Sequence, residues 1–136
     1  MYRVVLDPVV IVRGLINPYS ICGSLLSDYA SRYKAIFSAE TGHALIWLPY
    51  HPMLMVKYPR IVRLDPRQAG RLFARAEKVH IDLDAHPNAF IATAVAAKAD
   101  YLICEDAQLL AVRGKTTVPF LSAAAFVALL ESEMAT

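Results

Sequence analysis

The chain has only two cysteines, no long uninterrupted apolar run and little net charge. Its two cysteines, Cys22 and Cys104, lie in apolar sequence without metal-type spacing, which indicates reduced, buried thiols. No apolar run approaches the ~18 uninterrupted residues of a membrane span, and Met1 to Asp7 leads directly into a strand pattern. These absences argue against a disulfide scaffold, a membrane partner and a signal peptide, and they predict a cytoplasmic protein.

Charge and histidine patterns are also sparse. The net charge is only +2, so nucleic-acid binding would depend on a local basic surface. The histidines fit no zinc spacing, although His86 precedes an expected helix and could face a pocket. Apolar residues, in contrast, are abundant: 57% of the 136 residues are hydrophobic and 19% are charged. This composition predicts one compact domain over residues 1–136 rather than a disordered chain.

Short apolar runs alternate with segments of helical periodicity, which predicts an α/β fold with a mainly parallel sheet of four to five strands. The expected strands are 3–6, 34–37, 80–83, 100–104 and 118–121. The expected helices are 25–30 after a Ser24 cap, 39–48 after a Ser38 cap, 66–79, 87–98, 107–112 and 123–130 after a Ser122 cap. Pro49, Pro52 and Pro59 mark a loop-rich stretch between the second and third of these helices.

Acidic residues follow two of the expected strands. Val4-Val5-Leu6 leads into Asp7, and Tyr101-Leu102-Ile103-Cys104 leads into Glu105 and Asp106. The carboxyl ends of parallel strands meet at one edge of a sheet, where α/β proteins bind ligands. Carboxylates at that edge are suitable ligands for a divalent cation, so Asp7 and Asp106 are candidate metal ligands.

Four segments are informative together: Val4 to Leu15, Asn88 to Ile91, Ala99 to Asp106, and Phe120 to Leu130. In their order and spacing they resemble the PIN-domain family, and within it the VapC-like toxins of bacterial and archaeal toxin–antitoxin pairs. The resemblance implies a three-layer α/β/α sandwich, a Mg²⁺ or Mn²⁺ cofactor and endoribonuclease activity. It also implies a homodimer, an RNA substrate and a cognate antitoxin as partners.

The acidic cluster of the family is only half present in this chain. The resemblance makes Asp7 and Asp106 the metal ligands, with Asn88 assisting in catalysis where the family has Asp. At other positions of the family's motif this chain has a different residue, namely at Pro8, Val9, Ala44, Cys104-Glu105 and Gln108. Nearby acids that could complete the site are Glu40, Asp84 and Glu105, but a first-turn acid such as Glu40 also simply favours the helix dipole.

Basic and aromatic residues suggest further surfaces. Arg67, Arg71, Arg75 and Lys78 recur at helical spacing and form a candidate RNA-binding ridge, or alternatively a solvated helix face. Arg13 is close in sequence to Asp7 and could pair with that carboxylate or take the place of a cation. The aromatic residues between Tyr19 and Tyr58 could form either core or a subunit interface.

Two functions therefore compete. One is a degenerate PIN domain that binds RNA or a partner and hydrolyses RNA weakly or not at all. The other is an active Mg²⁺- or Mn²⁺-dependent endoribonuclease toxin that uses Asp7 and Asp106, with Asn88 or a nearby acid completing the site. The first predicts that Asp7→Asn relieves repulsion with Asp106. A response-regulator-like domain also has an acid after its first strand, but this chain lacks the accompanying Lys pattern.

Overall fold

Five parallel strands form one sheet in the order β3-β2-β1-β4-β5. In a computed structural model that describes residues 1–47, 52–59, 66–82, 88–111 and 116–134, every strand pairing is parallel. The strands are Tyr2–Leu6 (β1), Tyr33–Ser38 (β2), Glu77–Val79 (β3), Tyr101–Ile103 (β4) and Phe120–Leu121 (β5). This sheet confirms the expected α/β class.

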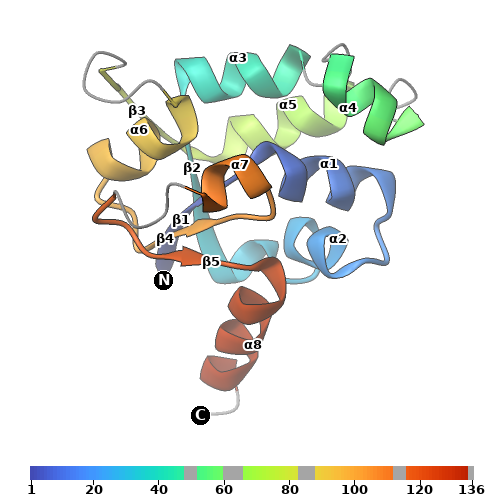
Figure 1. Cartoon of the computed structure of the whole chain (residues 1–136). Helices are drawn as coiled ribbons and strands as arrows, with labels where there is room; N and C mark the ends of the chain where they lie inside the picture. Colours follow the sequence, from blue (N-terminus) through green and yellow to red (C-terminus); the bar gives the residue numbers. More distant parts are fainter. Residues whose placement is uncertain (48–51, 60–65, 83–87, 112–115, 135–136) are drawn as a thin grey trace.

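Helices cover both faces of the sheet and complete a three-layer α/β/α sandwich (Figure 1). They are Pro8–Ile16 (α1), Ile21–Leu26 (α2), Ala39–Trp47 (α3), Pro52–Lys57 (α4), Pro66–Arg75 (α5), Ala89–Ala96 (α6), Ala107–Leu110 (α7) and Ala123–Met134 (α8). A 3₁₀ turn spans Ala30–Arg32. No helix within the described ranges is both long and apolar enough to span a membrane.

Successive residues of β1 point to opposite faces, and each face has its own core. Val4 and Leu6 pack with α1, α2, α5 and α8, whereas Val5 packs with α6 and α7. Helix α3 contributes Leu45 to the first core and Ala44 to the second. The sheet is therefore buried on both sides, which is why its strands are apolar without alternation.

The order of the strands creates a switch point between β1 and β4. The chain proceeds from β1 to β2 on one side and later adds β4 on the other side. Diverging connections at such a point leave a crevice outside the carboxyl ends of the strands. Asp7 follows β1, and Cys104, Glu105 and Asp106 follow β4, so these residues meet at that crevice.

The predicted helix over 66–79 is too long. Helix α5 ends at Arg75, and Glu77–Val79 form β3, which pairs with Ile36, Phe37 and Ser38 of β2. The expected strand over 80–83 therefore lies too late in the sequence. The apolar residues at 76 and 79 fit helical spacing, but backbone pairing with β2 overrides that local preference.

Several other boundaries differ from expectation, including the start of α2. Helix α2 begins after Ser20, whose Oγ accepts from the N–H of Gly23, while Ser24 lies inside the helix and its Oγ donates to the carbonyl of Ile21. Helix α4 forms in the stretch that was expected to be loop-rich, with Pro52 at its first position, where the missing N–H has no consequence. The predicted caps at Ser38 and Ser122 are confirmed.

Candidate functional site

Asp7 caps helix α1. Its Oδ1 accepts a hydrogen bond of 2.7 Å from the N–H of Val10. The sequence favours this arrangement, because Asp is a strong N-cap residue and Pro8 is suited to the first helical position. One carboxylate oxygen of Asp7 is therefore bonded to the helix that follows it.

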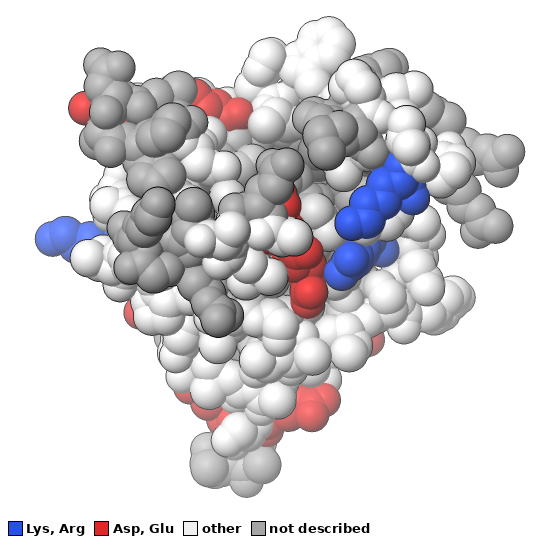
Figure 2. Space-filling model, viewed as in Figure 1, with Lys and Arg blue, Asp and Glu red and all other residues white. Residues whose placement is uncertain are grey.

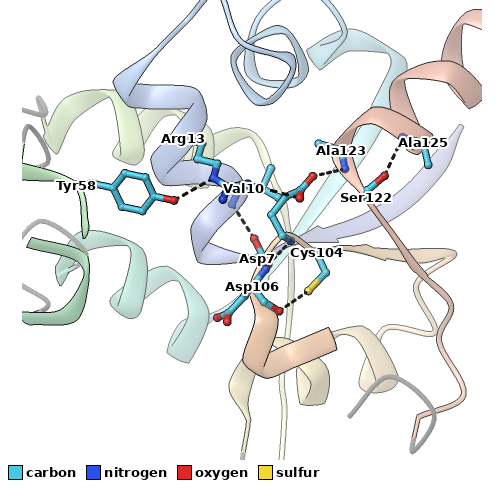
Figure 3. A network of polar contacts seen from close by, with 10 residues as sticks. Asp7, Val10, Arg13, Tyr58, Cys104, Asp106, Ser122, Ala123 and Ala125 are labelled. Atoms are coloured by element: carbon cyan, nitrogen blue, oxygen red, sulfur yellow. Dashed lines mark hydrogen bonds and ion pairs between the residues drawn. The ribbon is translucent and has the colours of Figure 1, made fainter. Parts of the chain in front are cut away.

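The second oxygen of Asp7 binds the chain that follows β4. Oδ2 accepts from the N–H groups of Glu105 and Asp106, both at 2.8 Å (Figure 3). The Asp7 backbone N–H donates to the carbonyl of Ile103 at 3.0 Å. The side chain joins two segments almost a hundred residues apart in sequence, and 0% of Asp7 is exposed.

Burial shifts the pKa values of two side chains at this crevice, Asp7 and Cys104. Burial raises the pKa of Asp7 above the ordinary carboxyl value, although the N–H groups of Val10, Glu105 and Asp106 oppose the shift. The pKa of the Cys104 thiol is also raised, by its burial and by the adjacent Asp7 carboxylate. The Sγ of Cys104 donates to the carbonyl oxygen of Asp106 at 3.5 Å.

Glu105 connects three elements. Its Oε1 accepts from the N–H of Ala123 at 3.0 Å, at the first turn of α8, and its Oε2 lies 3.6 Å from Nη1 of Arg13. Nε of Arg13 donates to the hydroxyl of Tyr58 at 3.0 Å. Arg13 therefore pairs with Glu105 rather than with Asp7, because both Asp7 oxygens already face backbone donors (Figure 3).

Asp106 follows Glu105 at the carboxyl end of β4. It is half-buried, as Glu105 is, and its carboxylate points away from Arg13 in Figure 3. The space-filling view shows acidic and basic surfaces side by side near the centre of this face (Figure 2). Among the described residues, no group of three or more His, Cys, Asp or Glu side chains is arranged to hold a metal ion.

Asn88 caps helix α6. Its Oδ1 accepts from the N–H groups of Phe90 at 2.9 Å and Ile91 at 3.1 Å. The amide oxygen is therefore bound to the backbone, as the Asp7 carboxylate is. The helix was expected to begin at Pro87, which lies outside the described residues, and Asn88 is its N-cap.

The remaining candidate acids are dispersed or outside the described residues. Glu40 is exposed in the first turn of α3. Asp84 and His86 lie outside the described residues, as does the side chain of Gln108. At two positions where the resemblance implies Asn and Glu, Val9 is buried in the core and Ala44 packs against the second core.

One polar cluster at this edge was not anticipated. Ser38, Thr41 and Thr93 are completely buried, at 0% exposure. Oγ of Ser38 accepts from the N–H of Thr41 at 3.1 Å and from Oγ1 of Thr93 at 2.9 Å. The Ser-x-x-Thr spacing signals the cap at Ser38, but only the packing of α6 on β2 adds Thr93. These bonded hydroxyls hold α3 and α6 to the end of β2.

The predicted basic ridge is shorter than expected. Arg67, Arg71 and Arg75 are exposed on α5, but Lys78 lies on β3. Nζ of Lys78 donates to the carbonyls of Ala74 at 3.0 Å and Ala76 at 2.9 Å. Its ammonium group thus neutralises the carboxyl end of α5, where the helix dipole favours a cation.

Comparisons with known proteins add no relative. No protein-family model matches the chain, and no curated protein sequence matches it either.

Proposed function

We propose that this chain is a PIN-like domain whose edge acids have become structural, so that it hydrolyses RNA weakly or not at all and acts by binding. The observation that carries the proposal is the state of Asp7. Its carboxylate accepts three backbone hydrogen bonds and is fully enclosed. A side chain in that state caps α1 and links the end of β1 to the residues that follow β4.

These residues do not fit a divalent cation well. Mg²⁺ requires oxygen ligands in near-octahedral geometry and normally keeps several waters. Both acceptor positions of Asp7 Oδ2 are used by N–H groups, and Asn88 uses its oxygen to cap α6. Glu105 is held between Arg13 and α8. Asp106 is half-buried, and in the close-up its carboxylate points away from Arg13 (Figure 3).

The binding function would use exposed surfaces outside this crevice. Trp47, Met55 and Val56 expose 53%, 40% and 83% of their surface on α3 and α4, which suits a protein partner such as an antitoxin or a second copy. The exposed Arg67 on α5 could contact RNA. The free, buried Cys22 and Cys104 suit a reducing compartment such as the cytoplasm.

A titration with Mn²⁺ and Mg²⁺ tests the proposal, with thermal unfolding and RNA cleavage as parallel readouts. A ligand of the folded state raises its stability by RT ln(1 + [L]/Kd). We expect no rise of the unfolding temperature at tens of millimolar metal, and no metal-dependent cleavage. Asp106→Asn should leave both readouts unchanged.

The alternative is an active endoribonuclease in which Asp106 and Asp7 bind the metal. It would be supported by a metal-dependent rise in the unfolding temperature together with cleavage that Asp106→Asn abolishes. The matched control is Asp28→Asn, which changes an exposed acid away from the crevice. If cleavage disappeared in Asp106→Asn and persisted in this control, the non-hydrolytic proposal would be wrong.

A further inference from the structure

A cleft of about 450 Å³ lies between α1, α2 and α5. Its described lining includes Leu15, Leu26 and Leu72, together with Arg71 and Arg75, and none of the crevice residues discussed above. The volume lies within the range of small-molecule sites, which are concave and mostly apolar with a few polar groups. The cleft is a second candidate site, separate from the carboxyl edge.

Close approach of the helices shapes this cleft. A Cβ on Gly14 would lie 2.6 Å from Cδ1 of Leu26 and 2.8 Å from the carbonyl oxygen of Cys22. A Cβ on Gly23 would lie 2.4 Å from the carbonyl oxygen of Pro18. Gly14 therefore lets α1 pack tightly on α2, Gly23 lets α2 approach the connection at Asn17 and Pro18, and α5 also lines the cleft.

The cations of the cleft differ in their contacts from three other basic residues that the structure describes. Arg3, Arg13 and Lys78 are each bonded to an acid or to carbonyl groups. Within the described ranges, the guanidinium groups of Arg71 and Arg75 form neither an ion pair nor a hydrogen bond. They are four residues apart on α5, so they stand on one face of the helix and both line the cleft.

The apolar surface continues beyond the cleft. An adjoining hollow of about 390 Å³ shares Ser27, Leu72 and Arg75 with it and extends to Tyr33 and Lys34. The two hollows therefore adjoin each other, and their lining combines apolar residues with Arg71, Arg75 and Lys34. A nucleic-acid backbone has a charge at every nucleotide and needs polar partners throughout, so this combination suits it poorly.

We propose that the cleft binds a small amphipathic carboxylate, an apolar chain or ring system with a single anionic group. The carboxylate lies against Arg71 and Arg75, whose planar guanidinium groups match its geometry, and the apolar body lies on Leu15, Leu26 and Leu72. This inference is independent of any activity at Asp7 and Asp106.

Calorimetric titration with decanoate below its micelle concentration tests this inference, with decanol as the uncharged probe. We expect saturable binding of decanoate and weaker binding of decanol. The double variant Arg71→Met/Arg75→Met keeps the apolar stems and removes both charges, so decanoate affinity should fall about tenfold or more. Ala74→Phe fills the cleft with both arginines intact and should also weaken binding.

Arg67→Met is the matched control, because Arg67 is on the same helix but is not among the residues that line the cleft. It should leave decanoate affinity unchanged. Equal affinity for decanoate in the wild type and the double variant would overturn the inference, as would equal binding of decanoate and decanol. Displacement of decanoate by a short single-stranded RNA, lost in the double variant, would assign these arginines to nucleic acid instead.

Discussion

At the scale of single residues, side chains at the crevice act as acceptors for helix N-termini. Asp7 caps α1, Asn88 caps α6, and Glu105 accepts from the first turn of α8. The first N–H groups of a helix have no partner within the helix, and helices in an α/β fold begin at the carboxyl edge of the sheet. Oxygen-bearing side chains there can bind either a metal ion or the free N–H groups of a helix. Asp7, Asn88 and Glu105 bind helix N–H groups.

Asp7→Asn tests that role. The amide has one oxygen, so its NH₂ group must face either the N–H of Val10 or the N–H groups of Glu105 and Asp106. We expect the free energy of unfolding to fall by roughly 2–4 kcal/mol, since buried donors lose their acceptor. The three hydrogen bonds thus reverse the earlier expectation that this variant relieves repulsion.

Urea unfolding followed by circular dichroism gives the measurement for Asp7→Asn. Asp28→Asn is the control, because Asp28 is exposed, and it should change the stability by less than about 0.5 kcal/mol. An Asp7→Asn variant as stable as the wild type would mean that the three hydrogen bonds are dispensable. The structural role of Asp7 would then be wrong.

At the scale of elements, helix packing depends on where glycine occurs. A Cβ on Gly42 of α3 would lie 2.3 Å from Cε2 of Phe73 on α5, whereas a Cβ on Gly70 of α5 meets nothing within 4 Å. Gly42→Ala should therefore force α3 and α5 apart and lower stability by about 1–3 kcal/mol. Gly70→Ala, the same change in an open helical position, should raise stability by about 0.5–1 kcal/mol.

Thermal unfolding of the two glycine variants provides the comparison, because the chemical change is identical and only the surroundings differ. Shifts of opposite sign are expected. Two stabilising shifts would show that Phe73 moves aside without cost, and the tight contact between α3 and α5 would then not contribute to stability.

The N-cap of α6 gives a second prediction for an element. Asn88→Ala removes the acceptor for Phe90 and Ile91 and should lower stability by about 1 kcal/mol. Asn88→Asp should retain stability, because Asp and Asn are comparable N-caps. Chemical denaturation of both variants, with the metal titration repeated on Asn88→Asp, separates capping from metal binding. A large loss of stability in Asn88→Asp would contradict a purely capping role.

At the scale of the whole molecule, Arg3 ties three elements together at the amino-terminal edge of the sheet. Its guanidinium binds the Glu77 carboxylate on β3 and donates to the carbonyl of Ala97, after α6, at 2.8 Å. Its backbone N–H donates to Oδ2 of Asp100 at 2.8 Å. These contacts lie at the opposite end of the strands from Asp7. Each end of the sheet therefore has a side chain that bonds to segments distant in sequence.

The Arg3–Glu77 pair predicts a dependence of stability on pH. The Arg3 guanidinium lowers the pKa of Glu77 from its ordinary value of 4.5. The contribution of the pair is therefore present above that value and is lost as the pH falls through the lowered pKa. Glu77→Gln should cost at most about 1 kcal/mol at neutral pH, because both side chains are about one-third exposed and are screened by solvent.

Urea unfolding of the wild type and Glu77→Gln across an acid series measures this effect. The difference between them should shrink as the pH falls below the ordinary range of Glu. A difference that stays constant down to the most acidic condition would mean that Glu77 acts by packing and not by its charge.

The sequence was sufficient for the class of fold because local signals and core pattern agreed. The apolar runs of β1, β2 and β4 are strands, and caps such as Ser38 and Ser122 begin their helices. It was insufficient for Glu77–Val79, since three residues carry little periodic signal and their strand exists only by pairing with β2. The same applies to Lys78, whose partners are carbonyls of the preceding helix.

By itself, then, the sequence determined the alternation of strands and helices, the two-sided core and the acids at the switch point, because these follow from residue type and local spacing. Only the tertiary structure decided what those acids do. The packing of β1 against β4 brings Asp7 to the N–H groups of Glu105 and Asp106, and that of α1, α2 and α5 leaves Arg71 and Arg75 over an apolar cleft. A carboxylate or guanidinium has the same sequence signature whichever partner it meets, and that partner comes from a distant segment of the chain.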